Sequence, residues 1–123
     1  MRSASKGFTL IETILSVSIL LIVVIAALLA VTNSIFLNEF SRNLVTASND
    51  AQHVLEQIKA KSFNDIPAYV SGYPASEFSN LPQETVSFPN PGYTSNLITI
   101  TVQISWDERN ATRTFSITTR FAQ

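Results

Sequence analysis

The sequence predicts an α+β fold in which one long N-terminal helix packs on a small antiparallel β-sheet of three to four strands. Residues 8–61 contain neither proline nor glycine, so one helix can run through them for about 80 Å. Residues 97–106 and 112–121 alternate apolar and polar side chains, which is the pattern of half-buried strands. All five prolines lie in residues 62–96, which predicts a loop-rich connection between the helix and these strands.

The front of the predicted helix, residues 8–31, is apolar enough to cross a lipid bilayer. Glu12 is its single charged residue, and an apolar run of 18 or more residues spans a bilayer core of about 30 Å. Arg2 and Lys6 precede the run and no basic excess follows it, so we expect a cytoplasmic N-terminus and the rest of the chain outside. A cleaved secretory signal peptide fits less well, because its apolar core is shorter and ends in small residues.

Residues 32–61 continue the helix in amphipathic form. Apolar side chains recur at spacings of three or four, and we expect this stripe to dock the sheet: Phe36, Phe40, Leu44, Ala47, Ala51, Val54, Leu55 and Ile58. Lys59 and Lys61 suit the last turn, and Pro67 then forbids continuation. Asp50 and Glu56 do not form a carboxylate pair at this spacing, so we expect both to be solvated. His53 is predicted to be a partly exposed helix residue.

Residues 62–123 are predicted to form a small globular head. Its loop region, residues 62–96, contains one short strand near residues 84–88. A β-hairpin follows over residues 97–121, with Asn110 in a left-handed conformation at its turn. We expect the apolar face of the hairpin to pack on the stripe from Phe40 to Ile58, and its threonine-rich face to meet water. Five aromatic residues are predicted to pin the loops to this core rather than to form an exposed binding surface: Phe63, Tyr69, Tyr73, Phe78 and Tyr93.

The composition argues against several classes of function. Eight basic and nine acidic residues give a formal net charge of -1, so no basic patch for nucleic acid is expected. The absence of cysteine excludes disulfides, thiolate metal sites and cysteine catalysis. No nucleophile–base set, glycine-rich phosphate loop or carboxylate cluster stands out, and residues 107–110 offer few oxygens for calcium. We therefore expect no enzymatic activity, no cofactor and no metal.

The segment Lys6-Gly7-Phe8-Thr9-Leu10-Ile11-Glu12, followed directly by the apolar run, resembles the N-terminal motif of type IV pilins and pseudopilins. The resemblance covers residues 1 to about 31 closely, and it implies a pilin-like fold. It further implies that a membrane-embedded prepilin peptidase cuts between Gly7 and Phe8 and methylates the new amine of Phe8. Residues 1–7 would then be a leader peptide whose charges are Arg2 and Lys6, and its removal leaves six basic and nine acidic residues.

In the same family, the glutamate at the position of Glu12 pairs with the N-terminal amine of a neighbouring subunit. A buried charge without a partner is costly, and such a pair is satisfied in one axial register alone. The resemblance therefore implies that Glu12 sets the register of assembly. Glu12→Val or Glu12→Ala is expected to be processed normally but to enter filaments poorly.

The resemblance implies a structural subunit of a type IV pilus or related filament, stored in the inner (cytoplasmic) membrane and then extracellular or periplasmic. The lack of proline in the apolar helix favours a minor pilin or pseudopilin over a main pilus subunit. The implied partners are the prepilin peptidase, other pilin or pseudopilin subunits, the inner-membrane assembly platform and the lipid bilayer. Two alternatives remain: a pseudopilin of a type II secretion or DNA-uptake (competence) system, and an uncleaved single-pass membrane-anchored binding domain.

Overall fold

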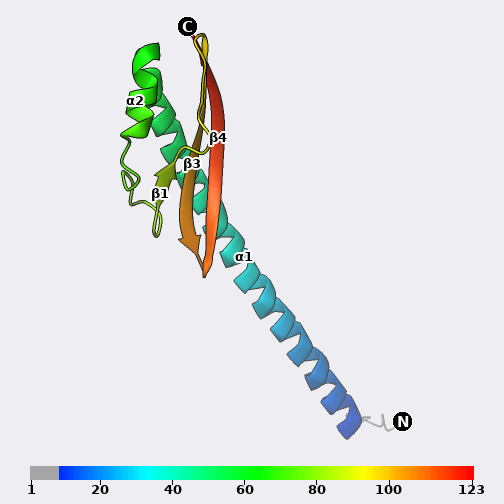
Figure 1. Ribbon diagram of the computed structural model, residues 1–123. Helices are drawn as coiled ribbons and strands as arrows, with labels where there is room; N and C mark the ends of the chain where they lie inside the picture. The colour runs from blue at the N-terminus through cyan, green and yellow to red at the C-terminus, as the bar shows by residue number, and fades with distance from the viewer. Residues whose placement is uncertain (1–8) are drawn as a thin grey trace, which may run out of the picture. The chain divides into compact units, whose positions relative to one another are not determined.

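The computed structural model describes residues 9–123, which form two α-helices, one short 3₁₀-helix and one β-sheet (Figure 1). In chain order the elements are α1 (Leu10–Lys59), η1 (Phe63–Asp65), α2 (Ile66–Ser71), β1 (Thr85–Ser87), β2 (Gly92–Tyr93), β3 (Leu97–Glu108) and β4 (Ala111–Ala122). The chain divides into two compact units with their boundary between Glu39 and Phe40. The first unit contains the apolar front of α1, and the second contains the rear of α1 and everything that follows.

Helix α1 is a continuous 50-residue helix, as the absence of proline and glycine predicts. It ends at Lys59, slightly before the predicted limit. The last turn tightens there, because the Lys61 amide donates to the Ile58 carbonyl, three residues back, at 3.0 Å. Lys59 is the basic residue of this last turn.

Helix α2 is absent from the sequence prediction, which interprets Pro67 as a stop signal. The structure places Pro67 in the first turn of α2. A proline is tolerated there because the first amides of a helix have no partner within it. Pro67 therefore begins a new helix and does not end α1, which stops at Lys59, and the loop region is more helical than the sequence suggests.

The sheet has four antiparallel strands with β3 at its centre. The short strand β1 pairs with β3 from Thr85↔Ser105 to Ser87↔Gln103, which confirms the strand predicted near residues 84–88. Strand β2, two residues long, also pairs with β3 and is the fourth strand. Strands β3 and β4 form the predicted hairpin, which is longer than predicted and pairs from Leu97↔Ala122 to Glu108↔Ala111.

The hairpin closes through a two-residue turn. Arg109 and Asn110 have φ angles of 50° and 67°. Positive φ at both central residues matches the twist of the flanking strands in a type I′ turn. The left-handed conformation predicted for Asn110 is confirmed, and Arg109 shares it.

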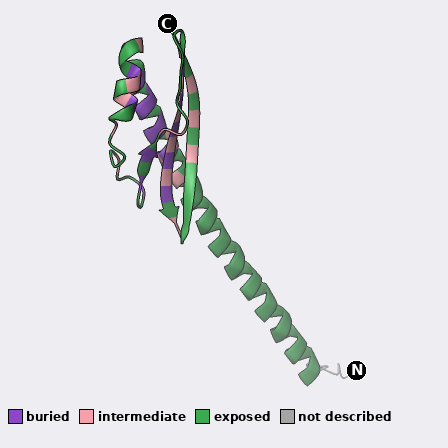
Figure 2. Ribbon diagram, in the orientation of Figure 1, coloured by how far each residue is buried: buried purple, intermediate pink, exposed green. Residues whose placement is uncertain are grey.

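The head core forms where the rear half of α1 faces β3, and both surfaces are buried in Figure 2. Its buried apolar residues come from α1 (Ala47, Ala51, Val54, Leu55, Ile58), from the loop region (Ile66, Val70, Leu81, Val86) and from alternate positions of β3 (Ile98, Ile100, Val102, Ile104, Trp106). Phe63, Tyr69, Tyr73 and Phe78 pack partly buried against this core, as predicted. Tyr93 does not, and remains exposed.

The buried stripe of α1 is shorter than the predicted stripe from Phe40 to Ile58. It begins at Ala47, while Phe40 and Leu44 remain 38% and 36% exposed. The buried alternation of β3 ends at Trp106, so the strand offers no further apolar side chain to these positions. The Arg113 guanidinium lies over the Phe40 ring instead, 5.6 Å from its centroid.

Candidate functional site

The front of α1 presents a long apolar surface. Every large hydrophobic residue from Leu10 to Leu37 is exposed, and Figure 2 shows this part of the helix without a buried position. Among the described residues, α1 is the one helix long and apolar enough to cross a membrane. Soluble proteins rarely expose apolar patches of this extent, so this surface is suited to lipid or to other helices.

Several hydroxyl groups within this surface bond to the helix itself. Ser18 Oγ donates to the Ile14 carbonyl at 2.8 Å. Thr32 and Ser34 bond in the same way to carbonyls three and four residues back, both at 2.9 Å. Hydrocarbon cannot hydrogen-bond to these groups, so a helix in lipid must satisfy them internally.

The first turn of α1 is capped by Thr9. Its Oγ1 accepts a hydrogen bond from the Glu12 amide at 3.4 Å, and its carbonyl accepts one from the Thr13 amide at 3.1 Å. Thr9 and Glu12 have the spacing of a capping box, in which the two residues close the helix end together. Thr9 is absent from the predicted site residues, although the spacing Thr-x-x-Glu was the signal for it.

Glu12 lies exposed in this first turn, as the acidic residue of an otherwise apolar segment. No side chain among residues 9–123 forms an ion pair with it. The other predicted site residues, Arg2, Lys6, Gly7 and Phe8, lie outside the described residues. The cleavage position and the amine that Glu12 would pair with therefore stay predictions.

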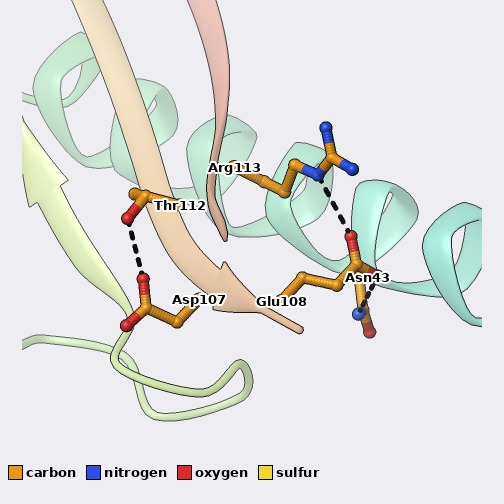
Figure 3. A network of polar contacts seen from close by, with 5 residues as sticks. All are labelled: Asn43, Asp107, Glu108, Thr112 and Arg113. Atoms are coloured by element: carbon orange, nitrogen blue, oxygen red, sulfur yellow. Dashed lines mark hydrogen bonds and ion pairs between the residues drawn. The ribbon is translucent and has the colours of Figure 1, made fainter. Parts of the chain in front are cut away.

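Glu108 joins the end of the hairpin to α1 (Figure 3). Asn43 Nδ2 donates to Glu108 Oε1 at 3.1 Å, and Arg113 Nε lies 3.5 Å from Glu108 Oε2. Beside them, Thr112 Oγ1 donates to Asp107 Oδ1 at 2.9 Å. Glu108 thus holds the sheet to the helix, while Asp107 bonds within the hairpin. Residues 9–123 contain no group of three or more His, Cys, Asp or Glu side chains arranged for a metal.

A second polar contact fastens α2 to α1. Tyr69 and Tyr73 both donate their hydroxyls to Gln57 Oε1, at 2.9 and 3.1 Å. Burial, with the Glu77 carboxylate nearby, raises the pKa of Tyr73 to about 12, so its hydroxyl remains a donor at physiological pH. A shallow hollow beside the two rings carries no nucleophile–base pair, and we interpret the contact as structural.

Asp50 is buried rather than solvated, which corrects the expectation from the sequence. It shares the inward face of α1 with Ala47 and Ala51, and Asn80 Nδ2 donates to both of its carboxylate oxygens, at 3.1 and 3.2 Å. Its spacing of three and four residues from Ala47 and Val54 was the available signal. Glu56, by contrast, is exposed as expected, and so is His53.

Comparison with known proteins connects the N-terminal segment to one family model. The model of the prokaryotic N-terminal methylation motif matches residues 2–28. No curated protein and no solved structure matches the chain. The match covers the Lys6–Glu12 segment and most of the apolar run, and it does not extend into the head.

Proposed function

We infer the function from one combination, a prepilin-type N-terminal methylation motif on an α+β pilin-like fold. From it we propose that the chain is a structural subunit, of the minor pilin type, of a type IV pilus or related filament. One observation carries the proposal: the motif continues directly into a helix whose apolar side chains are exposed from Leu10 to Leu37. Its activity would be assembly through this helix rather than catalysis.

Processing is the first step of the proposed function. The prepilin peptidase would cut between Gly7 and Phe8 on the cytoplasmic side of the membrane and methylate the Phe8 amine. Gly7 suits this cut because a residue without a side chain lets an extended backbone enter a protease cleft. Removal of Arg2 and Lys6 would also free the apolar helix from two charges at its cytoplasmic end.

Storage in the membrane would precede assembly. The apolar front of α1 would cross the inner membrane with its N-terminus in the cytoplasm and the head outside. The assembly platform would then transfer the subunit from lipid to a filament in which other subunits replace the lipid around the same surface. The exposure of this surface and its internally bonded hydroxyl groups support both environments.

Glu12 would set the axial register of each subunit. A carboxylate among apolar helices is costly unless a cation reaches it. The methylated amine of Phe8 on a neighbouring subunit is the cation that processing would create. Because the pair forms at one axial offset, it would favour correctly aligned subunits over all others.

Mass spectrometry of the membrane-extracted protein tests this proposal. Expressed with a prepilin peptidase, the chain is expected to lose residues 1–7 and gain one methyl group at Phe8. Gly7→Leu should remain uncut, because its side chain obstructs the cleft, whereas Ala4→Leu in the same leader should be cut normally. Retention of Met1 in the wild-type chain would refute the proposal and support an uncleaved membrane-anchored binding domain.

A pseudopilin of a type II secretion or DNA-uptake system is the second candidate. The helix has no proline within its apolar segment and runs without a break through residues 10–59, which suits a minor subunit of either machine. Both candidates predict the same cleavage. Co-purification of the processed chain with pilus subunits or with secretion components would separate them.

A further inference from the structure

Two carboxyl groups meet inside the head. Asp50 comes from the inward face of α1, and Glu84 comes from the loop that leads into β1. They are 8% and 6% exposed and are the two buried polar residues among residues 9–123. The end of α1, η1 and α2 lie between them in the sequence, so their proximity is a product of the fold.

Loop residues Asn80 and Leu81 donate hydrogen bonds to the two carboxyl groups. Glu84 Oε2 accepts from the backbone amides of Asn80 and Leu81, at 2.9 and 3.0 Å. The Asn80 side chain bonds in turn to the Asp50 carboxylate. Glu84 therefore bonds within the loop, and the contact between Asn80 and Asp50 holds the loop to α1.

The remaining oxygen, Glu84 Oε1, is buried and has no donor among the described residues. Asn80 bonds to both acids, to Glu84 through its backbone amide and to Asp50 through its side chain, so the two carboxyl groups are neighbours. Two ionised carboxylates cannot bond to each other, because both are acceptors. A proton on Glu84 Oε1 would turn this unpartnered oxygen into a donor to Asp50.

Among residues 9–123, no positively charged side chain pairs with Asp50 or Glu84. Asp50 is the charged group that acts on Glu84, and neither acid forms an ion pair within residues 9–123. His53, one turn further along α1, is exposed, and the Glu77 carboxylate acts on Tyr73 instead. On the β3 side, Asp107 bonds to Thr112. Because no cation among residues 9–123 pairs with either acid, a proton is left to offset one of the two negative charges.

We propose that Asp50 and Glu84 share one proton, and that this proton fastens the loop of residues 80–84 to helix α1. In the protonated pair, the Glu84 O–H donates to the Asp50 carboxylate. Loss of the proton to solvent leaves two facing carboxylates in the core and loosens the loop. The head would therefore respond to pH through a buried contact that is not part of the methylation motif.

The direction of the response follows from linkage. Burial, with Asp50 nearby, raises the pKa of Glu84 above its ordinary value of 4.5. Protonation of Glu84 is therefore favoured in the folded head. The stabilisation from this proton is complete below the ordinary pKa, and it is lost as pH rises through the raised pKa of the folded state. For each unit by which the pKa of Glu84 is higher in the folded than in the unfolded state, the equilibrium constant for folding falls about tenfold as pH rises between the two pKa values.

Thermal unfolding of the full chain in detergent micelles tests the proposal. The single tryptophan, Trp106, is 1% exposed, so its fluorescence reports on the head core. Between the ordinary glutamate pKa of 4.5 and about pH 8, the wild-type Tm should fall by about 5–10 °C per unit of pKa difference. Glu84→Gln, whose amide donates to Asp50 at every pH, should remove most of this fall.

Glu56→Gln is the matched control, because Glu56 lies exposed on the same helix, and this variant should follow the wild type. Equal slopes of Tm against pH for Glu84→Gln and the wild type would overturn the proposal. If Glu84→Gln fails to fold, an NMR titration of the wild-type carboxyl carbons decides. A Glu84 midpoint above 4.5 supports the shared proton, and one at or below 4.5 overturns it. Neither result depends on cleavage after Gly7, so the proposed function is tested separately.

Discussion

At the scale of single residues, the role of each acidic residue depends on whether it is exposed or buried. Glu12 lies exposed on an apolar helix, where it meets no cation among residues 9–123. Asp50 and Glu84 lie buried, and donors from Asn80 and Leu81 satisfy most of their oxygens. The first acid suits pairing with another molecule, and the other two hold the head together.

Glu12→Gln removes the charge of Glu12 but keeps a side chain that can cap the first turn of α1. Glutamine also serves at the third position of a capping box, so the helix end should be preserved. Loss of the charge should leave the Phe8 amine of a neighbouring subunit unpaired, at a cost of about 3 kcal/mol, or about 100-fold in incorporation. Quantifying the variant in membranes and in sheared filaments measures this effect.

Ser16→Ala, one turn further along the same helix, is the control and should be incorporated normally. Cleavage after Gly7 should be equal in all three proteins, because the substitutions lie beyond the cut. Filaments that contain Glu12→Gln at the wild-type level would show that the charge does not set the register.

At the scale of elements, the β3–β4 hairpin depends on its turn and on α1. Strand β3 is buried at alternate positions from Ile98 to Trp106, while the inward residues of β4 are at most half-buried. A hairpin alone is marginally stable in water, so packing on α1 supplies most of its stability. The Asn43–Glu108 bond and the two-residue turn hold the far end of the hairpin.

Substitutions of Asn110 test this turn. Its φ of 67° suits asparagine and glycine but forces a β-branched side chain against the backbone. Asn110→Val should lower the free energy of unfolding by about 1–2 kcal/mol, whereas Asn110→Gly should match or slightly exceed the wild type. Thermal unfolding followed by Trp106 fluorescence measures both. Equal stability of the two variants would contradict the left-handed turn.

At the scale of the whole molecule, the chain combines two units with different stabilising environments. Residues 10–39 present apolar side chains and bury none of them within the chain. Residues 40–123 contain the whole buried core of the part that the structure describes, from Ala47 to Trp106. The first unit therefore needs lipid or other helices, and the second has its own source of stability.

Residues 40–123 are expected to fold in buffer without the apolar helix. Near-ultraviolet circular dichroism should show an ordered Trp106, and unfolding should be cooperative. Residues 60–123 are the matched control, and they should not fold because they lack the five core residues that α1 supplies. Cooperative unfolding of the shorter fragment would show that the sheet does not depend on α1.

Much of the fold follows from the sequence because the relevant signals are local. The absence of proline and glycine in residues 8–61 predicts α1, and the alternation of apolar residues predicts β3 and β4. The methylation motif is likewise a contiguous segment, which the family model matches at residues 2–28. Such features need no knowledge of what each segment packs against.

The tertiary structure decided the features that depend on distant contacts. The buried stripe begins at Ala47 rather than Phe40 because β3 offers no apolar side chain beyond Trp106. Asp50 is buried because Asn80, thirty residues away, supplies its hydrogen bonds, and the same residue also bonds to Glu84. The periodicity of a helix shows which residues share a face, but the length and polarity of the covering sheet and loops determine how much of that face leaves water.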